Sequence, residues 1–156
     1  MPRHQYKKRT VQPDPLYNSF EVSKLINYVI KDGKKSTTEK IIYGVLDEVK
    51  KTEDPVRLLH RAISHVAPNF EVRPRRLGGA SYLVPTEVRK ERKLYLALHW
   101  IIDAAQARSQ KEYRTFQKKL FAELIDASKN QGQAVNKRLQ TEKLAEANKA
   151  FAHLKW

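Results

Sequence analysis

Apolar residues recur at intervals of three and four along most of the chain, a spacing that predicts amphipathic helices. The first such stripe follows Ser19 and is closed by Gly33, a residue type that commonly ends helices. The second stripe follows Ser36, where the order Ser-Thr-Thr-Glu, ending at Glu39, has the form of a capping box. The predicted inward positions of these two helices are Val22, Leu25, Ile26, Val29, Ile30, Ile41, Ile42, Val45, Leu46 and Val49.

Four further helices are predicted from the same spacing. Asp54 is a suitable N-cap and Pro55 a suitable first residue for the third helix. The fourth is expected to begin near Glu91, the fifth after a possible cap within residues 109–112, and the sixth near Ala134. Their predicted inward positions are Val56, Leu59, Ile63 and Val66 in the third; Leu94, Leu98, Ile101, Ile102 and Ala105 in the fourth; Phe116, Leu120, Leu124 and Ile125 in the fifth; and, less regularly, Val135, Leu139, Leu144, Ala147 and Phe151 in the last.

Residues 70–90 do not follow the helical spacing. Two short runs rich in Val, Tyr, Thr and Phe flank Gly78 and Gly79, which can adopt the positive φ angles that a tight hairpin turn requires. The expected fold is therefore mainly α: a six-helix bundle with one β-hairpin arm inserted between the third and fourth helices.

The charge of the chain points to a polyanionic partner. There are 31 Lys and Arg residues against 17 Asp and Glu, giving a formal net charge of +14. Nucleic acid is the leading candidate and an anionic membrane surface the second, since such an excess of charge opposes compaction unless it is neutralised. No run of about 18 apolar residues is present, so no membrane span is predicted. The absence of cysteine excludes disulfides and thiolate chemistry and fits a cytoplasmic protein.

The hairpin carries three arginines near its tip. The alternation of side chains along a strand places Arg73 and Arg75 on one face. The apolar row of the return strand, which begins at Tyr82, is expected on the other face, where it would seat the arm on the helices. Because guanidinium groups contact phosphate with two hydrogen bonds and stack on unpaired bases, these two arginines and Arg76 are predicted RNA contacts.

Other cations gather in a basic N-terminal arm, before the second helix, at the root of the hairpin, and around the start of the fifth helix. Those before the second helix lie at a helix N-terminus, whose partial positive charge also favours an anion. Those around the fifth helix are three and four residues apart and would share a face if that stretch is helical. The RNA contacts predicted from these groups are Arg3, Lys7, Lys8, Arg9, Lys34, Lys35, Arg89, Arg92, Arg108, Lys111, Arg114 and Lys118.

No catalytic or metal-binding motif is found. His60 and His65 are five residues apart, which is not the spacing of a zinc-binding H-E-x-x-H helix, and no phosphate-binding glycine motif is present. We therefore expect a non-catalytic protein without cofactor or metal. Two alternatives remain open from the residues alone: a DNA-binding regulator that places a helix in the major groove, and an enzyme that acts on nucleic acid.

Three segments together resemble the bacterial form of the universal small-subunit ribosomal protein seven family. They are Asp32 to Tyr43 (DGKKSTTEKIIY), Val72 to Arg89 (VRPRRLGGASYLVPTEVR) and Ala145 to His153 (AEANKAFAH), followed by Trp156. The resemblance extends over essentially the whole chain. It implies one RNA-binding helical domain over residues 1–156, with a basic extended arm at 1–18, the hairpin arm at 70–90 and a C-terminal tail at 150–156.

The resemblance also implies a function and partners. Members of the family are structural proteins of the small ribosomal subunit that bind the 3′ major domain of 16S rRNA directly and nucleate assembly of the head. The hairpin is then expected near the exit-site tRNA and the mRNA path, and neighbouring small-subunit proteins of the head and platform are further expected partners. Carried over by position, the resemblance adds the backbone at Gly78 and Gly79 to the RNA contacts.

Overall fold

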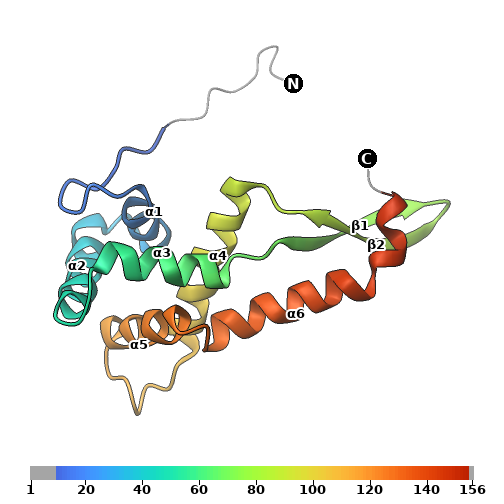
Figure 1. Cartoon of the computed structure of the whole chain (residues 1–156). Coiled ribbons are helices and arrows are strands. Elements are labelled where there is room, and N and C mark those ends of the chain that lie inside the picture. The colour runs from blue at the N-terminus through green and yellow to red at the C-terminus, as the bar shows by residue number, and fades with distance from the viewer. Residues whose placement is uncertain (1–9, 155–156) are drawn as a thin grey trace.

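The computed structural model describes residues 10–154. Within this part of the chain, helices surround a common core and a two-stranded hairpin projects from them between the third and fourth helices (Figure 1). The mainly helical fold with one inserted hairpin is thus confirmed. The elements are α1 (Phe20–Val29), α2 (Lys35–Lys50), α3 (Pro55–Val66), β1 (Phe70–Leu77), β2 (Ala80–Glu87), α4 (Lys90–Ala107), α5 (Phe116–Ser128), α6 (Gln133–Ala147) and the 3₁₀ helix η1 (Lys149–Leu154).

Two helix starts show how local chemistry sets the boundaries. Asp54 caps α3 as predicted, because its carboxylate accepts a hydrogen bond from the backbone N–H of Val56 at 2.9 Å, with Pro55 as the first helical residue. The cap of α5 is Thr115, whose hydroxyl accepts from the backbone N–H three residues further on at 3.4 Å. The cap predicted within residues 109–112 is therefore wrong.

The capping box predicted at Ser36 is also wrong. α2 has already begun before this residue, so that Ser36 and Glu39 both lie inside the helix, and its N-cap, Lys34, has no capping side chain. The cause is the tight turn at Asp32 and Gly33, whose φ angles of 53° and 71° lie in the left-handed region. This turn brings the chain into the helix earlier than the capping box requires.

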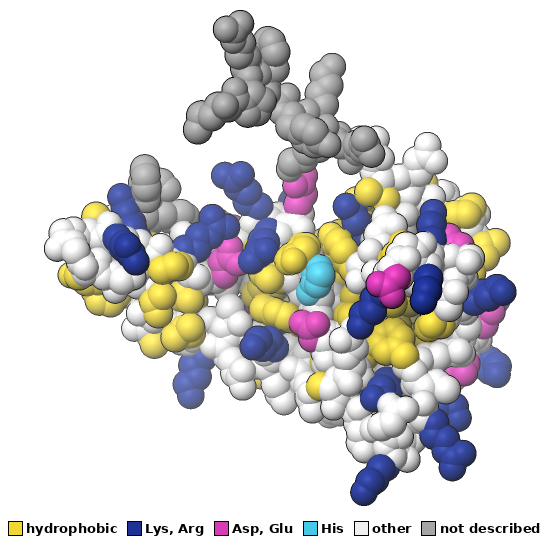
Figure 2. Space-filling view, turned by 180° about the vertical axis from the view of Figure 1, so that it is seen from behind, with side chains coloured by type: hydrophobic (Ala, Val, Ile, Leu, Met, Phe, Trp, Pro, Cys, Tyr) yellow, Lys and Arg dark blue, Asp and Glu magenta, His cyan; other side chains and the backbone are white. Residues whose placement is uncertain are grey.

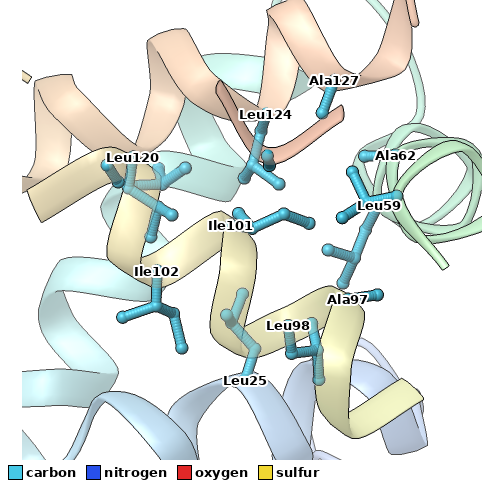
Figure 3. Packing of buried hydrophobic residues seen from close by; sticks show 14 of the residues in the cluster. Leu25, Leu59, Ala62, Ala97, Leu98, Ile101, Ile102, Leu120, Leu124 and Ala127 are labelled. Carbon is cyan, nitrogen blue, oxygen red and sulfur yellow. The ribbon is translucent and has the colours of Figure 1, made fainter. Parts of the chain in front are cut away.

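The core is formed where one face of each of α1 to α5 meets the others. Leu25, Leu59, Leu98, Ile101 and Leu124 are fully buried there, and Figure 3 shows them converging from four helices. Burial of each such side chain stabilises the fold by about 1.5–3 kcal/mol. Apolar residues therefore occupy the inward positions, and their helical spacing predicted these positions. In the first five helices and at their ends, the predicted inward residues that are only half-buried are Val29, Ile30, Ile41, Val56, Ile63, Leu94, Phe116 and Ile125.

α6 departs from its predicted stripe. Its buried apolar residues are Ala134 and Val135 in the first turn and Ala145 near the end. Leu139 and Leu144, predicted to face inward, are 50% and 44% exposed. The reason is visible in Figure 1, where α6 leaves the bundle after its first turn and runs beside the hairpin.

The register of the hairpin corrects the predicted separation of its faces. Arg73 lies opposite Val84, and Arg75 lies opposite Tyr82. Because directly opposed residues of an antiparallel pair share a face, the arginines lie on the same face as the apolar row of the return strand. The Tyr82 ring packs against Phe151 of η1 with 5.3 Å between centroids. Part of the predicted C-terminal tail is therefore a short helix that packs on the arm.

The described part of the N-terminal segment is anchored to α2. Asp14 is buried, and its carboxylate accepts hydrogen bonds from the backbone N–H of Leu16 and Tyr17, each at 3.1 Å, and from the Tyr43 hydroxyl at 2.8 Å. Residues 10–18 therefore form a turn that is fastened to the helices.

Candidate nucleic-acid interface

The turn between α1 and α2 presents the two lysines predicted as phosphate contacts. Lys34 and Lys35 are both exposed, directly after the left-handed turn, and Lys35 makes an ion pair with Glu39 at 3.7 Å. No side chain caps α2, and its partially positive N-terminus lies directly at these lysines, which are its N-cap and first residue. The other predicted N-terminal contacts, Arg3, Lys7, Lys8 and Arg9, lie outside the described residues.

A groove of about 400 Å³ lies beside this turn and brings distant parts of the chain together. Lys31 and Lys34 line it from the α1–α2 turn, Lys119 from α5, and Gln106 and Gln110 from the end of α4 and the loop that follows. Lys119 is only 8% exposed, and no ion pair is formed by it within residues 10–154. No acidic side chain of the described residues lines this lysine groove, which makes it a site where a phosphate would relieve the repulsion of the lysines.

The loop between α4 and α5 carries two of the predicted cations. Lys111 and Arg114 lie in irregular structure rather than in a helix, so the shared helical face predicted for them with Lys118 is not formed. Both are exposed, and Lys118 is exposed on the first turn of α5. The loop projects from the body of the protein (Figure 1), and Lys and Arg side chains are spread over it and over the hairpin in Figure 2.

Arg108, at the start of this loop, is placed differently from the other candidates. Its guanidinium donates to Glu123 Oε2 from Nε at 2.8 Å and from Nη2 at 2.6 Å, and it also pairs with Asp126. Burial lowers the pKa of Arg108, but the hydrogen bonds and charges of Asp126 and Glu123 outweigh it and raise the pKa above its ordinary value. The Arg108 side chain is 15% exposed, so its charge is largely balanced inside the protein.

At the root of the hairpin, Glu71 fixes two arginines. Its Oε1 accepts from Arg73 Nε at 3.0 Å and Nη2 at 2.7 Å, while its Oε2 accepts from Arg92 Nε at 3.3 Å. Glu71 is 9% exposed, whereas the two arginine side chains are 64% and 46% exposed. One buried carboxylate therefore orients two cations whose outer edges still face solvent, which reduces the entropy that they would lose on meeting a phosphate.

Toward the tip the two remaining arginines differ in their surroundings. Gly78 and Gly79 form the turn with φ angles of 56° and 88°, and no other atom lies within 4 Å of a Cβ added at either. Arg76 is exposed, and Arg75 donates to the backbone carbonyl of Leu154 in η1. The turn thus offers unobstructed backbone at the end of a basic arm.

A second groove, of about 560 Å³, lies between the hairpin and the start of α4. It is lined by Arg73, Arg89, Lys90 and Lys93, with Glu87 as the one acidic residue among the described residues that line it. Arg89 is exposed as the N-cap of α4, so the hairpin root and the helix terminus present their charge together.

Sequence reasoning did not select Lys31 or Lys119 as contacts. Lys31 directly precedes the turn at Asp32 and Gly33, and Lys119 directly follows Lys118, which was predicted as a contact. The spacing that singled out Lys118 assumed a continuous helix from Lys111, whereas the observed helix begins at Phe116 and turns Lys119 into the groove.

The described part of the chain holds no candidate metal site. Within residues 10–154, no group of three or more His, Asp or Glu side chains is arranged to hold a metal ion. His60 lies 3.6 Å from Glu21, and the His65 ring hydrogen-bonds the carbonyl of Ala127, so both have structural partners. No helix among these residues is long and apolar enough to cross a membrane.

Comparison with known proteins gives consistent matches over the whole chain. A family model described as "Ribosomal protein S7p/S5e" matches residues 1–149. A protein named "Small ribosomal subunit protein uS7" from Thermoanaerobacter sp. (strain X514) is 50% identical over 159 aligned residues, with 100% of both chains covered. Proteins of the same name from Chelativorans sp. (strain BNC1) and Xanthobacter autotrophicus are 48% and 50% identical, with 99% of this chain and 98% of each relative covered.

Proposed function

This chain belongs to the ribosomal protein S7p/S5e family, and on that premise we propose that it binds the 3′ major domain of 16S rRNA directly and nucleates assembly of the subunit head. Its family consists of ribosomal structural proteins, so the chain is a non-catalytic, rRNA-binding component of the small ribosomal subunit, a cytoplasmic complex. The specific RNA domain and the role in head assembly are the proposal.

The lysine groove beside the α1–α2 turn is the observation that supports the proposal best. Lys31 and Lys34 come from one turn and Lys119 from the distant α5, and no acidic residue among those described lines the groove between them. Cations that line one groove without counter-charges repel one another, and a phosphate backbone in the groove would reduce that repulsion. Such an arrangement is unfavourable for stability and favourable for binding a polyanion.

We assign the predicted contacts two different roles. The exposed cations Lys34, Lys35, Lys111, Arg114 and Lys118 contact phosphates directly, together with those of the hairpin and its root. Arg108 acts indirectly: its ion pairs hold the end of α4 against α5 and so position the loop that carries Lys111 and Arg114. The whole chain, including the basic arm at residues 1–18, acts as one RNA-binding domain in this proposal.

The hairpin is proposed to reach toward the exit-site tRNA and the mRNA path. Its projection from the helical body and the open backbone at Gly78 and Gly79 support this role, because the turn extends beyond the part of the arm that η1 contacts and can enter a groove between RNA strands. Crosslinking from a photoreactive group placed at Gly78 in assembled subunits tests it. Crosslinks to tRNA or mRNA are expected, and crosslinks confined to proteins remote from both would contradict it.

A filter-binding titration tests the RNA assignment. The full chain is titrated against a transcript of the 3′ major domain and against an unrelated RNA of equal length, at several salt concentrations. If about 6 to 10 phosphates are neutralised, affinity should fall by roughly 10³- to 10⁵-fold between about 50 and 200 mM salt. Equal affinity for the two RNAs would overturn the proposal.

Matched variants connect the titration to the groove. Lys119→Met and Lys34→Ala should each weaken binding and lower the salt slope by about 1. Lys50→Ala provides the control, because it removes an exposed lysine of the same helix at its opposite end, on the order of 24 Å away along the axis. The control should bind like the unchanged protein; a loss equal to that of Lys34→Ala would mean that only net charge matters.

A further inference from the structure

Aromatic side chains form a cluster between α1 and α4, and only Tyr28 among its tyrosines packs against the core. The ring centroids of Tyr28 and Tyr95 lie 5.6 Å apart in an edge-on arrangement, with an interplanar angle of 79°. His99 contacts both rings, at 4.7 Å from Tyr28 and 4.1 Å from Tyr95. Tyr95 remains 38% exposed, and Phe20 at the start of α1 is 40% exposed, so part of this aromatic surface faces solvent.

Cations lie over these rings. The Lys24 ammonium lies 5.3 Å from the centroid of Phe20 and 6.0 Å from that of Tyr28. The Arg92 guanidinium lies 5.1 Å from the centroid of Tyr95, while its Nε is held by Glu71 at 3.3 Å. Each of the three rings therefore has a cation over it, and two of the rings are exposed to solvent. Figure 2 shows hydrophobic side chains gathered between Lys and Arg side chains on the face opposite to that of Figure 1.

The position of this surface connects two proposed phosphate-binding regions. Tyr28 lies in the last turn of α1, directly before the turn that carries Lys31 and Lys34. Arg92 lies in the first turn of α4, beside the basic groove at the hairpin root. An RNA strand that contacts both regions through its backbone would pass over the aromatic rings between them.

Unpaired RNA bases stack on aromatic rings and on guanidinium planes, and an adjacent cation neutralises the phosphates of the same strand. Duplex RNA does not offer these faces, because its bases are already stacked. We propose that Phe20, Tyr28 and Tyr95, together with the cations Lys24 and Arg92 that lie over them, form a stacking surface for unpaired nucleobases of single-stranded RNA. This inference rests on the proposed RNA-binding function and adds to it a contact that is not electrostatic.

The Tyr95→Leu variant tests the stacking surface. Leucine keeps apolar volume on α4 but removes the ring, so binding to the 3′ major domain transcript should weaken by about 5- to 160-fold, corresponding to about 1–3 kcal/mol for one stacked base. The salt slope should stay unchanged, since no phosphate contact is lost. Tyr95→Phe, which keeps the ring, should bind within about twofold of the unchanged protein.

Two further variants separate stacking from a purely structural role. Phe20→Leu removes the exposed ring at the start of α1 and should weaken binding without a change in thermal midpoint. Phe70→Leu, which removes an aromatic ring that is 50% exposed outside the cluster, should leave affinity unchanged. Ultraviolet crosslinking of the same transcript, mapped by mass spectrometry, should join RNA to Phe20 or Tyr95.

The outcomes distinguish this inference from the function on which it rests. If the unchanged protein prefers the transcript over unrelated RNA but Tyr95→Leu and Phe20→Leu both bind as tightly, the stacking surface is wrong and the proposed function stands. A loss of affinity accompanied by a lower salt slope or a lower thermal midpoint in both variants would also overturn it. If the unchanged protein shows no preference, the proposed function itself fails.

Discussion

Replacement of Arg108 by methionine should destabilise the protein far more than the loss of one charge from a chain with a formal net charge of +14 suggests. Arg108 neutralises Glu123, which is fully buried. Glu123 also accepts, through Oε1, a hydrogen bond from the backbone N–H of Ala134 at 3.1 Å. This carboxylate therefore joins the end of α4, the middle of α5 and the start of α6.

The expected size of the effect follows from the burial of the partner that remains. In Arg108→Met the Glu123 carboxylate keeps its place but loses its counter-charge, and breaking a buried pair in this way costs about 3–5 kcal/mol. For a chain of this size the thermal midpoint should fall by roughly 6–20 °C. Adding Glu123→Gln to Arg108→Met removes the uncompensated charge while keeping the acceptor for Ala134, so the double variant should be more stable than Arg108→Met alone.

Urea unfolding followed by circular dichroism measures these free energies, and Arg61→Met is the matched control. Arg61 pairs with Glu53 at 2.6 Å, but the two side chains are 45% and 35% exposed, so its loss should cost about 0–1 kcal/mol. If Arg108→Met lowers the free energy of unfolding no more than Arg61→Met does, the ion pairs of Arg108 with Glu123 and Asp126 stabilise the protein no more than a surface ion pair. The assignment of Arg108 as the residue that positions the α4–α5 loop would then be wrong.

Three further predictions concern a tyrosine, two glycines and the hairpin. Burial and a hydrogen bond to Asp14 raise the pKa of Tyr43 from 10.0 to about 12. The stabilisation that this tyrosine provides is therefore fully present below pH 10.0 and is lost as the pH rises through about 12. In Tyr43→Phe, the free energy of unfolding measured in urea should decline less steeply over that pH range. Gly132→Ala should destabilise by more than about 2 kcal/mol, because a Cβ at this φ of 96° would lie 2.9 Å from Glu123 Oε1; Gly78→Ala, with φ 56° and open space, should cost only about 1–2 kcal/mol in the same assay. The triple variant Arg73→Ala, Arg75→Ala and Arg76→Ala should lower the salt slope of RNA binding by up to about 3 and keep the helical circular dichroism signal. Loss of that signal would instead show that the arm is needed for folding.

The helical part of the fold could be predicted because burial and sequence spacing have the same physical cause. In α1 to α5 one stripe of each helix meets the common core, so apolar residues recur with the period of the helix. α6 lacks this relation. Most of it lies beside the hairpin, where Glu142 accepts a hydrogen bond from the backbone N–H of Asn69 at 3.0 Å, so the spacing of Leu139 and Leu144 did not report an inward face.

The faces of the hairpin could not be assigned from alternation alone. Each strand shows which of its own residues share a side, but the side chains that face them from the other strand depend on the register, which the turn sets. With Leu77 opposite Ala80 across the two-glycine turn, Arg75 meets Tyr82 rather than Ser81. The tyrosine therefore packs beside an arginine and against η1, and a single-residue shift in register would have given the separation that was expected.

The cations show the limit of sequence reasoning most clearly, because a formal charge does not tell whether it is available to a ligand. Arg108 and Lys119 are both cations near the start of α5, and only the first was selected. Its acidic partners follow it by 15 and 18 residues, beyond any local spacing rule, and they balance its charge inside the protein. Lys119 has no ion pair in the described part of the chain and lines a groove without acids. Since only cations that displace counterions contribute to the salt dependence of RNA binding, Lys119→Met should lower the salt slope while Arg108→Met lowers stability and leaves the slope nearly unchanged.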